Sequence, residues 1–154
     1  MRETSRPDRP ERESVWDYPR RPRLEPADRP VRVVFGGDVV AETSRALKVR
    51  ERGSPPTYYI PLEDVAPGVL VANHHRTYCE WKGRAAYFDL VAGDRRSRRA
   101  AWTYPQPKAG YSELMYHVAF YAGRVDAAYL GDEQVVPQPG TFYGGWITAE
   151  VAGL

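Results

Sequence analysis

The 154-residue sequence predicts a mainly β protein with one or two short helices. Short runs of alternating polar and apolar residues recur at the spacing of an all-β domain, and glycine-rich turns separate several of them. The strand patterns do not alternate with long helical patterns, which argues against a parallel sheet. A chain of this length can bury a core without disulfides or metals. We therefore expect one compact domain built on an antiparallel sheet.

The first 30 residues differ in composition from the rest, because they alternate Arg, Asp, Glu and Pro and contain few aliphatic residues. Such a segment buries too little apolar surface to offset its ordering entropy. We predict a partly mobile arm over residues 1–30, a single β domain over 31–148 and a short tail over 149–154. Within the arm, the two aromatic residues of Ser14–Pro19 favour docking on the chain's own domain over docking on a neighbour.

Paired glycines predict the first hairpin. Val31–Phe35 and Asp38–Glu42 are strand-like runs, and Gly36-Gly37 between them supplies the positive φ angles that a two-residue turn needs. Arg45–Glu51 alternates apolar and basic residues, which favours a strand over a helix.

Prolines divide the next stretch of the chain. Ser54-Pro55-Pro56 is expected to break the preceding strand, and Pro61 to end the short extended run Tyr58–Ile60. Leu62–Val65 is predicted to form one helical turn. A loop through residues 67–76 then leads into the central hairpin.

The central hairpin carries the strongest strand signal. Residues 83–91 alternate with period two, a turn-forming Ala-Gly-Asp follows, and alternation resumes until Pro105. We predict that Gly83–Val91 pairs with Ser97–Tyr104. The basic cluster Arg95–Arg99 falls at the turn, where a solvated edge that resists strand addition is favoured over a phosphate contact.

Short elements are predicted after the central hairpin. They are a helix over Ala109–Tyr116 with Ser112 as its N-cap, strands at 117–121, 125–130 and 133–136, and an aromatic tail at Phe142–Thr148 that covers the open end of the sheet.

Three motifs carry a resemblance to a known family. They are Tyr78-Cys79-Glu80-Trp81-Lys82-Gly83, Ala101-Trp102-x-Tyr104-Pro105 and Val118–Tyr121, with supporting matches at Ser44–Leu47, Tyr58–Pro61 and Asp64. Together they resemble the bacterial domain of unknown function 427 family in the family's order, over about Arg32 to Val136. This family often has proline in place of Glu80. The resemblance implies a β-tent-like fold and a cleft lined by these motifs, and it implies no established reaction.

Composition limits the function classes. A net charge of +2 is too small for a dedicated nucleic-acid binder, so we expect no nucleic-acid partner. A single cysteine excludes an internal disulfide and any multi-cysteine zinc site. The charged N-terminus and the lack of a long apolar stretch predict a soluble, cytoplasmic protein with no membrane partner.

An aromatic-lined cleft that binds a small molecule is the preferred hypothesis. Lys82, between Trp81 and a glycine, could meet an anionic ligand group or lie on the surface. Core packing accounts for many of the aromatic residues, and the rest could form the cleft walls. The candidate ligand-binding residues are Trp81, Lys82, Tyr87, Trp102, Tyr104, Arg45, Tyr59 and Phe120. The sequence identifies no cofactor.

The alternative is an enzyme acting in the same cleft through Cys79 or His117. A lone cysteine in a strand is more often a small buried hydrophobe, and a histidine beside aromatic residues is more often structural. His74 and His75 lack partners at ligand spacing, so no metal site is predicted. Nucleotidyl transfer is also attached to the family's name. The acidic residues after Gly36-Gly37 belong to an ordinary hairpin, and the sequence has no phosphate-binding loop pattern there. Both observations argue against that reaction.

A third hypothesis is a structural or interaction protein. In it, the segments around Trp16 and Trp146 exchange with a second copy, which gives a homodimer.

Overall fold

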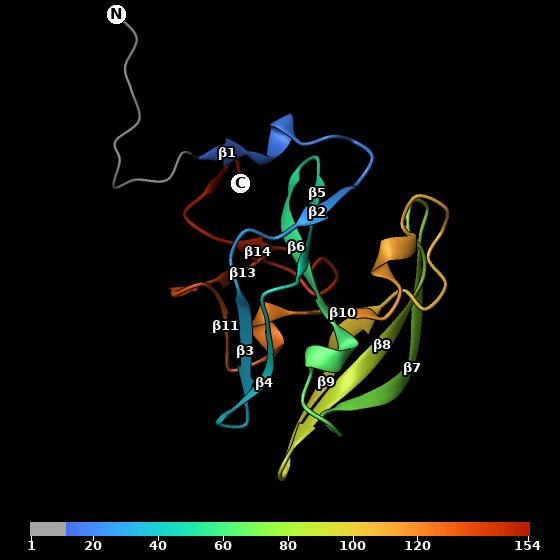
Figure 1. The fold of residues 1–154 in the computed structure, drawn as a ribbon, viewed down its shortest axis with the longest axis vertical. Coiled ribbons are helices and arrows are strands. Elements are labelled where there is room, and N and C mark those ends of the chain that lie inside the picture. The colour runs from blue at the N-terminus through green and yellow to red at the C-terminus, as the bar shows by residue number, and fades with distance from the viewer. Residues whose placement is uncertain (1–11) are drawn as a thin grey trace, which may run out of the picture.

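The computed structural model describes residues 12–154 and contains two antiparallel sheets (Figure 1). Residues 1–11, the first part of the predicted arm, lie outside the described residues. The prediction of a mainly β, antiparallel fold is confirmed. The only helical elements in the described part are four 3-10 turns: η1 (Val15–Asp17), η2 (Leu62–Asp64), η3 (Ser112–Leu114) and η4 (Ala122–Arg124).

The larger sheet has seven strands, and each is antiparallel to its neighbours. Their order is β2 (Arg23–Pro26), β5 (Leu47–Glu51), β6 (Ser54–Pro61), β10 (His117–Phe120), β9 (Arg95–Thr103), β8 (Gly83–Ala92) and β7 (Leu70–Cys79). The short strand β10 therefore joins two limbs, β2–β5–β6 and β9–β8–β7.

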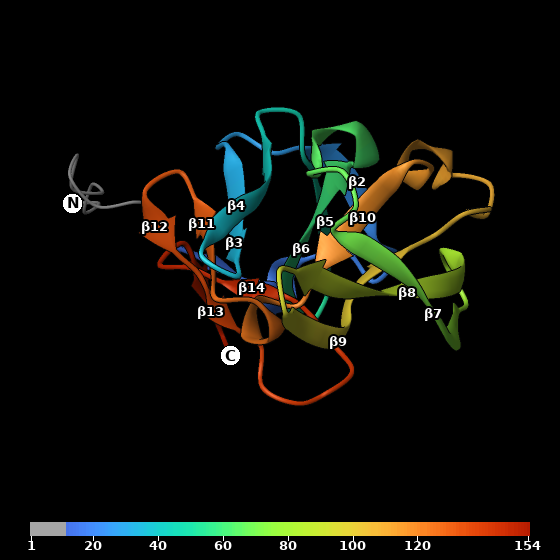
Figure 2. The same cartoon turned by 90° about the horizontal axis from the view of Figure 1, so that it is seen from below.

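The smaller sheet has four strands and lies beside the larger one (Figures 1 and 2). Its order is β12 (Glu133–Gln134), β11 (Ala127–Leu130), β3 (Val31–Phe35) and β4 (Asp38–Thr43). Two strand pairs complete the fold: β13 (Val136–Pro137) with β14 (Trp146–Ile147), and β1 (Glu13–Ser14) parallel to β15 (Val151–Ala152).

Both predicted hairpins are confirmed. β3 and β4 meet at Gly36 and Gly37, which have φ angles of 66° and 83°. β8 and β9 form the central hairpin and turn at Gly93, whose φ is 63°. The predicted strand at Arg45–Glu51 and the helical turn after Pro61 are also present, as β5 and η2.

The preceding strand β5 ends at Glu51, before Ser54-Pro55-Pro56, but these residues are not a break between strands, because β6 already begins at Ser54. Val49 pairs with Thr57 and Glu51 with Ser54, so both prolines lie opposite Arg50 in a bulge. A bulge interrupts the ladder and does not need the N–H groups that proline lacks.

The predicted loop over residues 67–76 is wrong from Leu70 onward, because β7 begins there. β7 is an edge strand with a bulge between Asn73 and Arg76, and its residues His74 and Arg76 are exposed. Ser112 is not an N-cap either: it is the first residue of η3, and the cap position is Tyr111.

The main core fills the space between the two sheets. Its largest fully buried side chains are Trp146, Phe35, Phe120, Ile60, Leu90 and Leu130, with Val31, Val33 and Val40. Trp146 belongs to the aromatic tail, and its indole Nε1 donates to the Phe120 carbonyl at 2.9 Å. The tail therefore contributes a central core residue as well as covering the sheet.

The two described ends of the chain pack on each other. Val15 and Tyr18 form a small buried cluster with Val151, beside Ile147. The Trp16 ring is mostly exposed, but its Nε1 donates to the Gly153 carbonyl at 2.8 Å. Residues 13–18 are thus held by the chain's own C-terminal segment.

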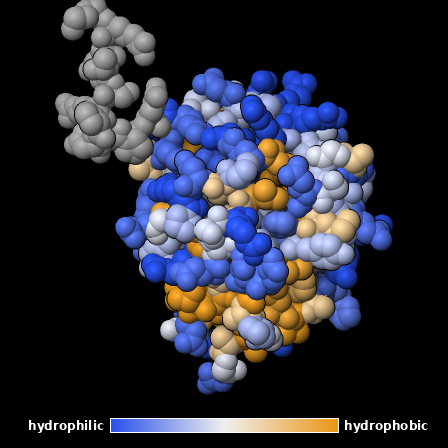
Figure 3. Space-filling model, viewed as in Figure 1, coloured by the Kyte–Doolittle hydropathy of each residue, from blue (hydrophilic) through white to orange (hydrophobic). Residues whose placement is uncertain are grey.

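The surface in the view of Figure 3 is mostly hydrophilic, with apolar side chains gathered toward the end where Figure 1 places β4 and β9. None of the helical turns between residues 12 and 154 has the length or apolar character needed to span a bilayer.

Asp89 on β8 ties together the bulges of its two neighbouring strands. Its buried carboxylate accepts hydrogen bonds from the Arg99 backbone N–H at 2.9 Å and from Asn73 Nδ2 at 2.8 Å, and Arg96 Nη2 approaches to 2.7 Å. Arg99 has a φ of 49°, an uncommon angle for a residue with a side chain. The Asn73 Oδ1 in turn accepts from the His75 N–H. One carboxylate thus fixes the bend of β7, β8 and β9.

The substitution Asp89→Asn is expected to destabilise the fold at neutral pH by roughly 1–3 kcal/mol, because it removes charge-assisted hydrogen bonds. Burial alone raises the pKa of Asp89, but the hydrogen bonds from Arg99, Arg96 and Asn73 lower it below its ordinary value. A lowered carboxyl pKa contributes stability above the unfolded pKa of about 4, which is lost as the pH falls through the folded pKa. The gap between wild type and variant should therefore narrow in acid.

Urea unfolding from neutral to acidic pH measures this gap. Asp94→Asn, in the exposed turn of the same hairpin, is the control and should leave stability unchanged. An Asp89→Asn variant as stable as wild type at neutral pH would contradict the assigned role.

Candidate functional site

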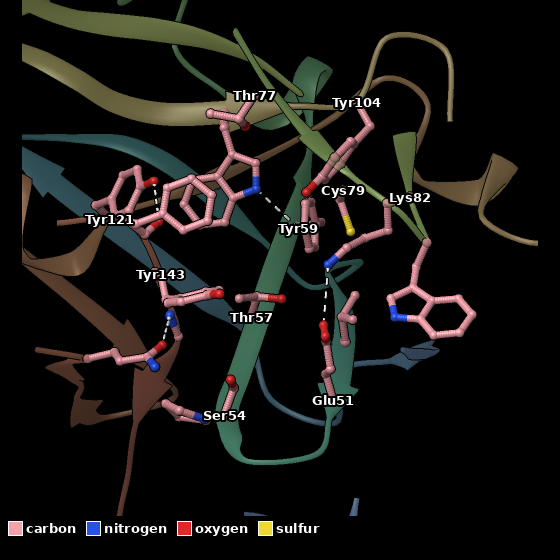
Figure 4. A pocket seen from close by; sticks show the side chains of 18 of the residues that line it. Glu51, Ser54, Thr57, Tyr59, Thr77, Cys79, Lys82, Tyr104, Tyr121 and Tyr143 are labelled. Carbon is pink, nitrogen blue, oxygen red and sulfur yellow. Dashed lines mark hydrogen bonds and ion pairs between the residues drawn. The ribbon is translucent and has the colours of Figure 1, made fainter. Parts of the chain in front are cut away.

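A cavity of about 230 Å³ lies on the face of the larger sheet opposite the main core (Figure 4). The limbs β5–β6 and β7–β8–β9 provide its walls, and a segment of the tail closes one side. Its lining consists of Val49, Glu51, Ser54, Pro55, Thr57, Tyr59, Thr77–Lys82, Tyr87, Trp102, Tyr104, Tyr121, Gln138 and Phe142–Gly145.

Strand alternation explains why aromatic residues face this cavity. On β6, Tyr58 and Ile60 enter the main core while Tyr59 lies in the second aromatic cluster. At β10, Phe120 likewise enters the main core, and Tyr121 after it joins the second cluster. The middle of the larger sheet, around β6 and β10, is therefore buried on both faces, and the second face is left with a hollow.

Trp102 forms the centre of the aromatic wall. Its Nε1 donates to the Tyr59 hydroxyl at 3.2 Å, and the two rings pack edge to face with centroids 6.1 Å apart. The Tyr121 ring lies 4.6 Å from it on another side, and the Tyr121 hydroxyl donates to the Phe142 carbonyl. These contacts leave one edge of the indole on the cavity and fix its orientation. Burial raises the pKa of both Tyr121 and Tyr104, so both hydroxyls stay protonated at neutral pH.

Lys82 places a buried cation in this aromatic setting. Its side chain is 9% exposed, and its Nζ lies 3.8 Å from Glu51 Oε1 and 5.6 Å from the centroid of the Tyr104 ring. Among the described residues, no hydrogen bond reaches this Nζ. Burial alone would lower the pKa of Lys82, but the acidic groups around it, including Tyr59 and Glu51, raise it above its ordinary value. The ammonium is therefore charged at neutral pH.

Lys108 holds the turn that carries Lys82 through two hydrogen bonds. The Lys108 backbone N–H donates to the Lys82 carbonyl at 2.9 Å, and its Nζ donates to the Glu80 carbonyl at 2.9 Å. Gly83 follows with a φ of 111°, an angle that a residue with a side chain rarely adopts. The position of Glu80 is thus fixed through its carbonyl group.

The structure brings together most of the residues that the sequence analysis selected. Trp81, Lys82, Tyr87, Trp102, Tyr104, Tyr59 and Cys79 all line the cavity. Cys79 ends β7, and Figure 4 shows its sulfur beside the Lys82 side chain.

Three of the selected residues, Arg45, Phe120 and His117, do not line the cavity. Arg45 is exposed and pairs with Glu63 at 2.9 Å and Asp64 at 3.1 Å. Phe120 is buried in the main core, because it faces the opposite side of its strand from Tyr121.

The placement of His117 in the same cleft is wrong. It lies at the far end of β10 opposite Pro61, and its Nδ1 is 2.9 Å from the Met115 carbonyl. The ring is thus turned toward the loop that precedes the strand.

The structure adds lining residues that the sequence analysis missed, among them Glu51, Thr57, Tyr121 and Tyr143. Counting by twos from Tyr59 along the strand would have found Thr57, and counting from Ala119 would have found Tyr121. Glu51 lies two residues after Val49 on β5, and both line the cavity, so counting by twos from Val49 would have found it.

The arginines of the basic cluster at the central hairpin form ion pairs away from the cavity. Arg95 pairs with Asp126 at 3.0 Å and Arg96 with Asp89, so both contact carboxylates. Between residues 12 and 154, no three His, Cys, Asp or Glu side chains are grouped to hold a metal ion.

The comparison with protein families gives one match. A family model described as Domain of unknown function (DUF427) matches residues 23–131. This range includes β2 through β11 and therefore most of the cavity wall, but it ends before the tail segment that closes one side. No curated protein matches the chain.

The substitution Gly144→Ala tests how the tail closes the cavity. A Cβ at residue 144 would lie 2.5 Å from Trp102 Cη2 and 3.0 Å from Tyr121 Cδ1, so the tail or the indole must move. Such overpacking typically costs about 1–3 kcal/mol. We expect a lower melting temperature and a changed tryptophan fluorescence spectrum.

Gly123→Ala is the matched control, because its added Cβ would only contact Pro137 at 3.4 Å. Wild-type stability and fluorescence in Gly144→Ala would show that the tail does not pack on Trp102 in this way.

Proposed function

The chain belongs to the DUF427 family, a domain family of unknown function, and we propose that it is a small-molecule binding module whose ligand occupies the aromatic cavity. The observation that carries this proposal is the buried ammonium of Lys82, which faces the cavity and has no hydrogen-bond acceptor among residues 12–154.

The energetics of Lys82 support a ligand with an acceptor group. A buried charge is costly unless it is both paired and hydrogen-bonded. The carboxylate of Glu51 at 3.8 Å compensates part of the charge but lies beyond hydrogen-bond distance. A carboxylate or similar acceptor on a ligand would complete the coordination of the ammonium.

The remaining lining supports a planar ligand body. The rings of Tyr59, Trp102, Tyr104 and Tyr121 surround a hollow with few charged groups. Ligand pockets commonly combine such apolar walls with a small number of placed polar groups. A cavity of about 230 Å³ limits the ligand to a compact molecule.

A thermal-shift screen of a metabolite library, including nucleotides, divalent metals and aromatic amines, tests this proposal. A compound that binds the native state raises the melting temperature by mass action. We expect at least one hit whose shift is lost in Lys82→Met, since the variant keeps the bulk of the side chain and removes the cation.

Lys48→Met is the matched control for this experiment. Lys48 is equally buried, but it pairs with Glu150 at 3.3 Å and does not line the cavity. Lys48→Met should melt at a lower temperature than wild type, and the ligand should still raise its melting temperature. A library without hits, or hits that survive in Lys82→Met, would count against binding in this cavity.

Catalysis through Cys79 is the second candidate function. It is favoured by one observation, the presence of the thiol in the same cavity as the Lys82 ammonium. A cysteine in this position could attack an electrophilic ligand, with the ammonium stabilising the negative charge that develops.

Alkylation of the folded protein with iodoacetamide tests the catalytic candidate. We expect one label at neutral pH, absent from Cys79→Ser and suppressed by any hit from the screen. A thiol that reacts only after unfolding would remove Cys79 from consideration as a nucleophile.

A further inference from the structure

Charged groups of both signs line the cavity. Lys82 contributes one cation and Glu51 one carboxylate. A ligand with several negative charges would meet one ammonium and an opposing carboxylate. Nucleoside di- and triphosphates therefore fit this lining poorly, and so do other polyanions.

Lys82 and Glu51 form a loose pair. Their charged atoms are 3.8 Å apart, which is longer than a direct hydrogen bond, and 39% of the Glu51 side chain is exposed. Glu51 can therefore turn toward a ligand without losing a hydrogen bond to Lys82. A ligand that bears only a carboxylate would bring a second negative charge beside Glu51, and one that bears only an ammonium would be repelled by Lys82.

The two charges lie at one side of the cavity. Figure 4 shows Lys82 and Glu51 on that side and Tyr121 and Tyr143 on the opposite side, with Thr57 between them. The cavity thus has both charges on one side, where the Tyr104 ring also lies 5.6 Å from Lys82 Nζ, and Tyr121 and Tyr143 on the other side. Tyr143 is 63% exposed and lies at the mouth of the cavity.

From this arrangement we propose that the cavity binds a small aromatic zwitterion of the α-amino acid class. The ligand carboxylate contacts Lys82, its ammonium contacts Glu51, and its planar side chain lies among the rings. In an α-amino acid both charges are borne by groups on one carbon atom, so they are as close together as those of the Lys82–Glu51 pair. This inference rests on the proposed binding function and adds the ligand class and the role of Glu51.

The test compares three related probes by isothermal titration calorimetry on the full chain. L-phenylalanine carries both charges, 3-phenylpropanoate lacks the ammonium and 2-phenylethylamine lacks the carboxylate. L-tyrosine and L-tryptophan extend the set to larger rings. We expect the best amino acid to bind roughly tenfold or more tightly than its analogues lacking either charge. Loss of the carboxylate leaves the buried Lys82 ammonium without a hydrogen-bond acceptor, and loss of the ammonium leaves the ligand carboxylate beside Glu51 without a compensating charge.

Two variants assign the contacts. Glu51→Gln should weaken the binding of the amino acids and strengthen the binding of 3-phenylpropanoate, because the opposing carboxylate is gone. Lys82→Met should weaken the binding of the amino acids and of 3-phenylpropanoate, and it should not weaken the binding of 2-phenylethylamine. Glu63→Gln, an exposed acid outside the cavity, is the matched control and should change none of the affinities.

Three results would overturn the inference. They are equal binding of L-phenylalanine and 3-phenylpropanoate, unchanged selectivity in Glu51→Gln, and no binding of any of the three amino acids at millimolar concentration. In each case a hit of another class in the library screen, lost in Lys82→Met, would leave the proposed binding function standing. Failure of both experiments would reject the two together.

Discussion

The fold depends on the burial of both faces of its larger sheet. Successive residues of a strand point to opposite faces, so Tyr59 and Ile60 serve two different packing layers. One layer meets the smaller sheet and is filled completely. The other has no second sheet to meet, and aromatic side chains with the tail segment cover it instead. Covering a wide face with a few large rings leaves the cavity between the two limbs.

The width of that cavity is set where regular strand pairing is interrupted. Strand β10 pairs with β6 only at His117 and Val118, so the two limbs diverge beyond it. The prolines of β6 lie in a bulge on one limb, and Asp89 fixes bulges on the other. Features that usually count against strand formation, prolines and a buried carboxylate, thus shape the sheet here.

Sequence reasoning succeeded where the determining interactions are local. Alternation and glycine turns were sufficient to find the hairpins, and the motifs around Cys79 and Trp102 were sufficient to indicate which segments meet. It failed for β7, because an edge strand keeps polar residues on its outer side and so lacks an apolar period. Phe120 was chosen in place of Tyr121 because two adjacent aromatic residues do not reveal which faces the core. Glu51 follows Leu47 and Val49 at the strand period, but an acidic residue at the end of an apolar face was not expected to line an aromatic cleft.

The two buried lysines of the larger sheet show how structural and ligand-facing charges differ in one protein. Lys48 is 4% exposed and has carboxylates of Glu150 and Glu13 at 3.3 and 4.0 Å, so its charge is compensated within the fold. Lys82 has one carboxylate at 3.8 Å and faces a hollow. The acidic groups around Lys82 keep it charged, but among the described residues none accepts a hydrogen bond from its Nζ. The two lysines therefore differ in geometry: the ammonium of Lys48 is hydrogen-bonded within the fold, and that of Lys82 faces the hollow.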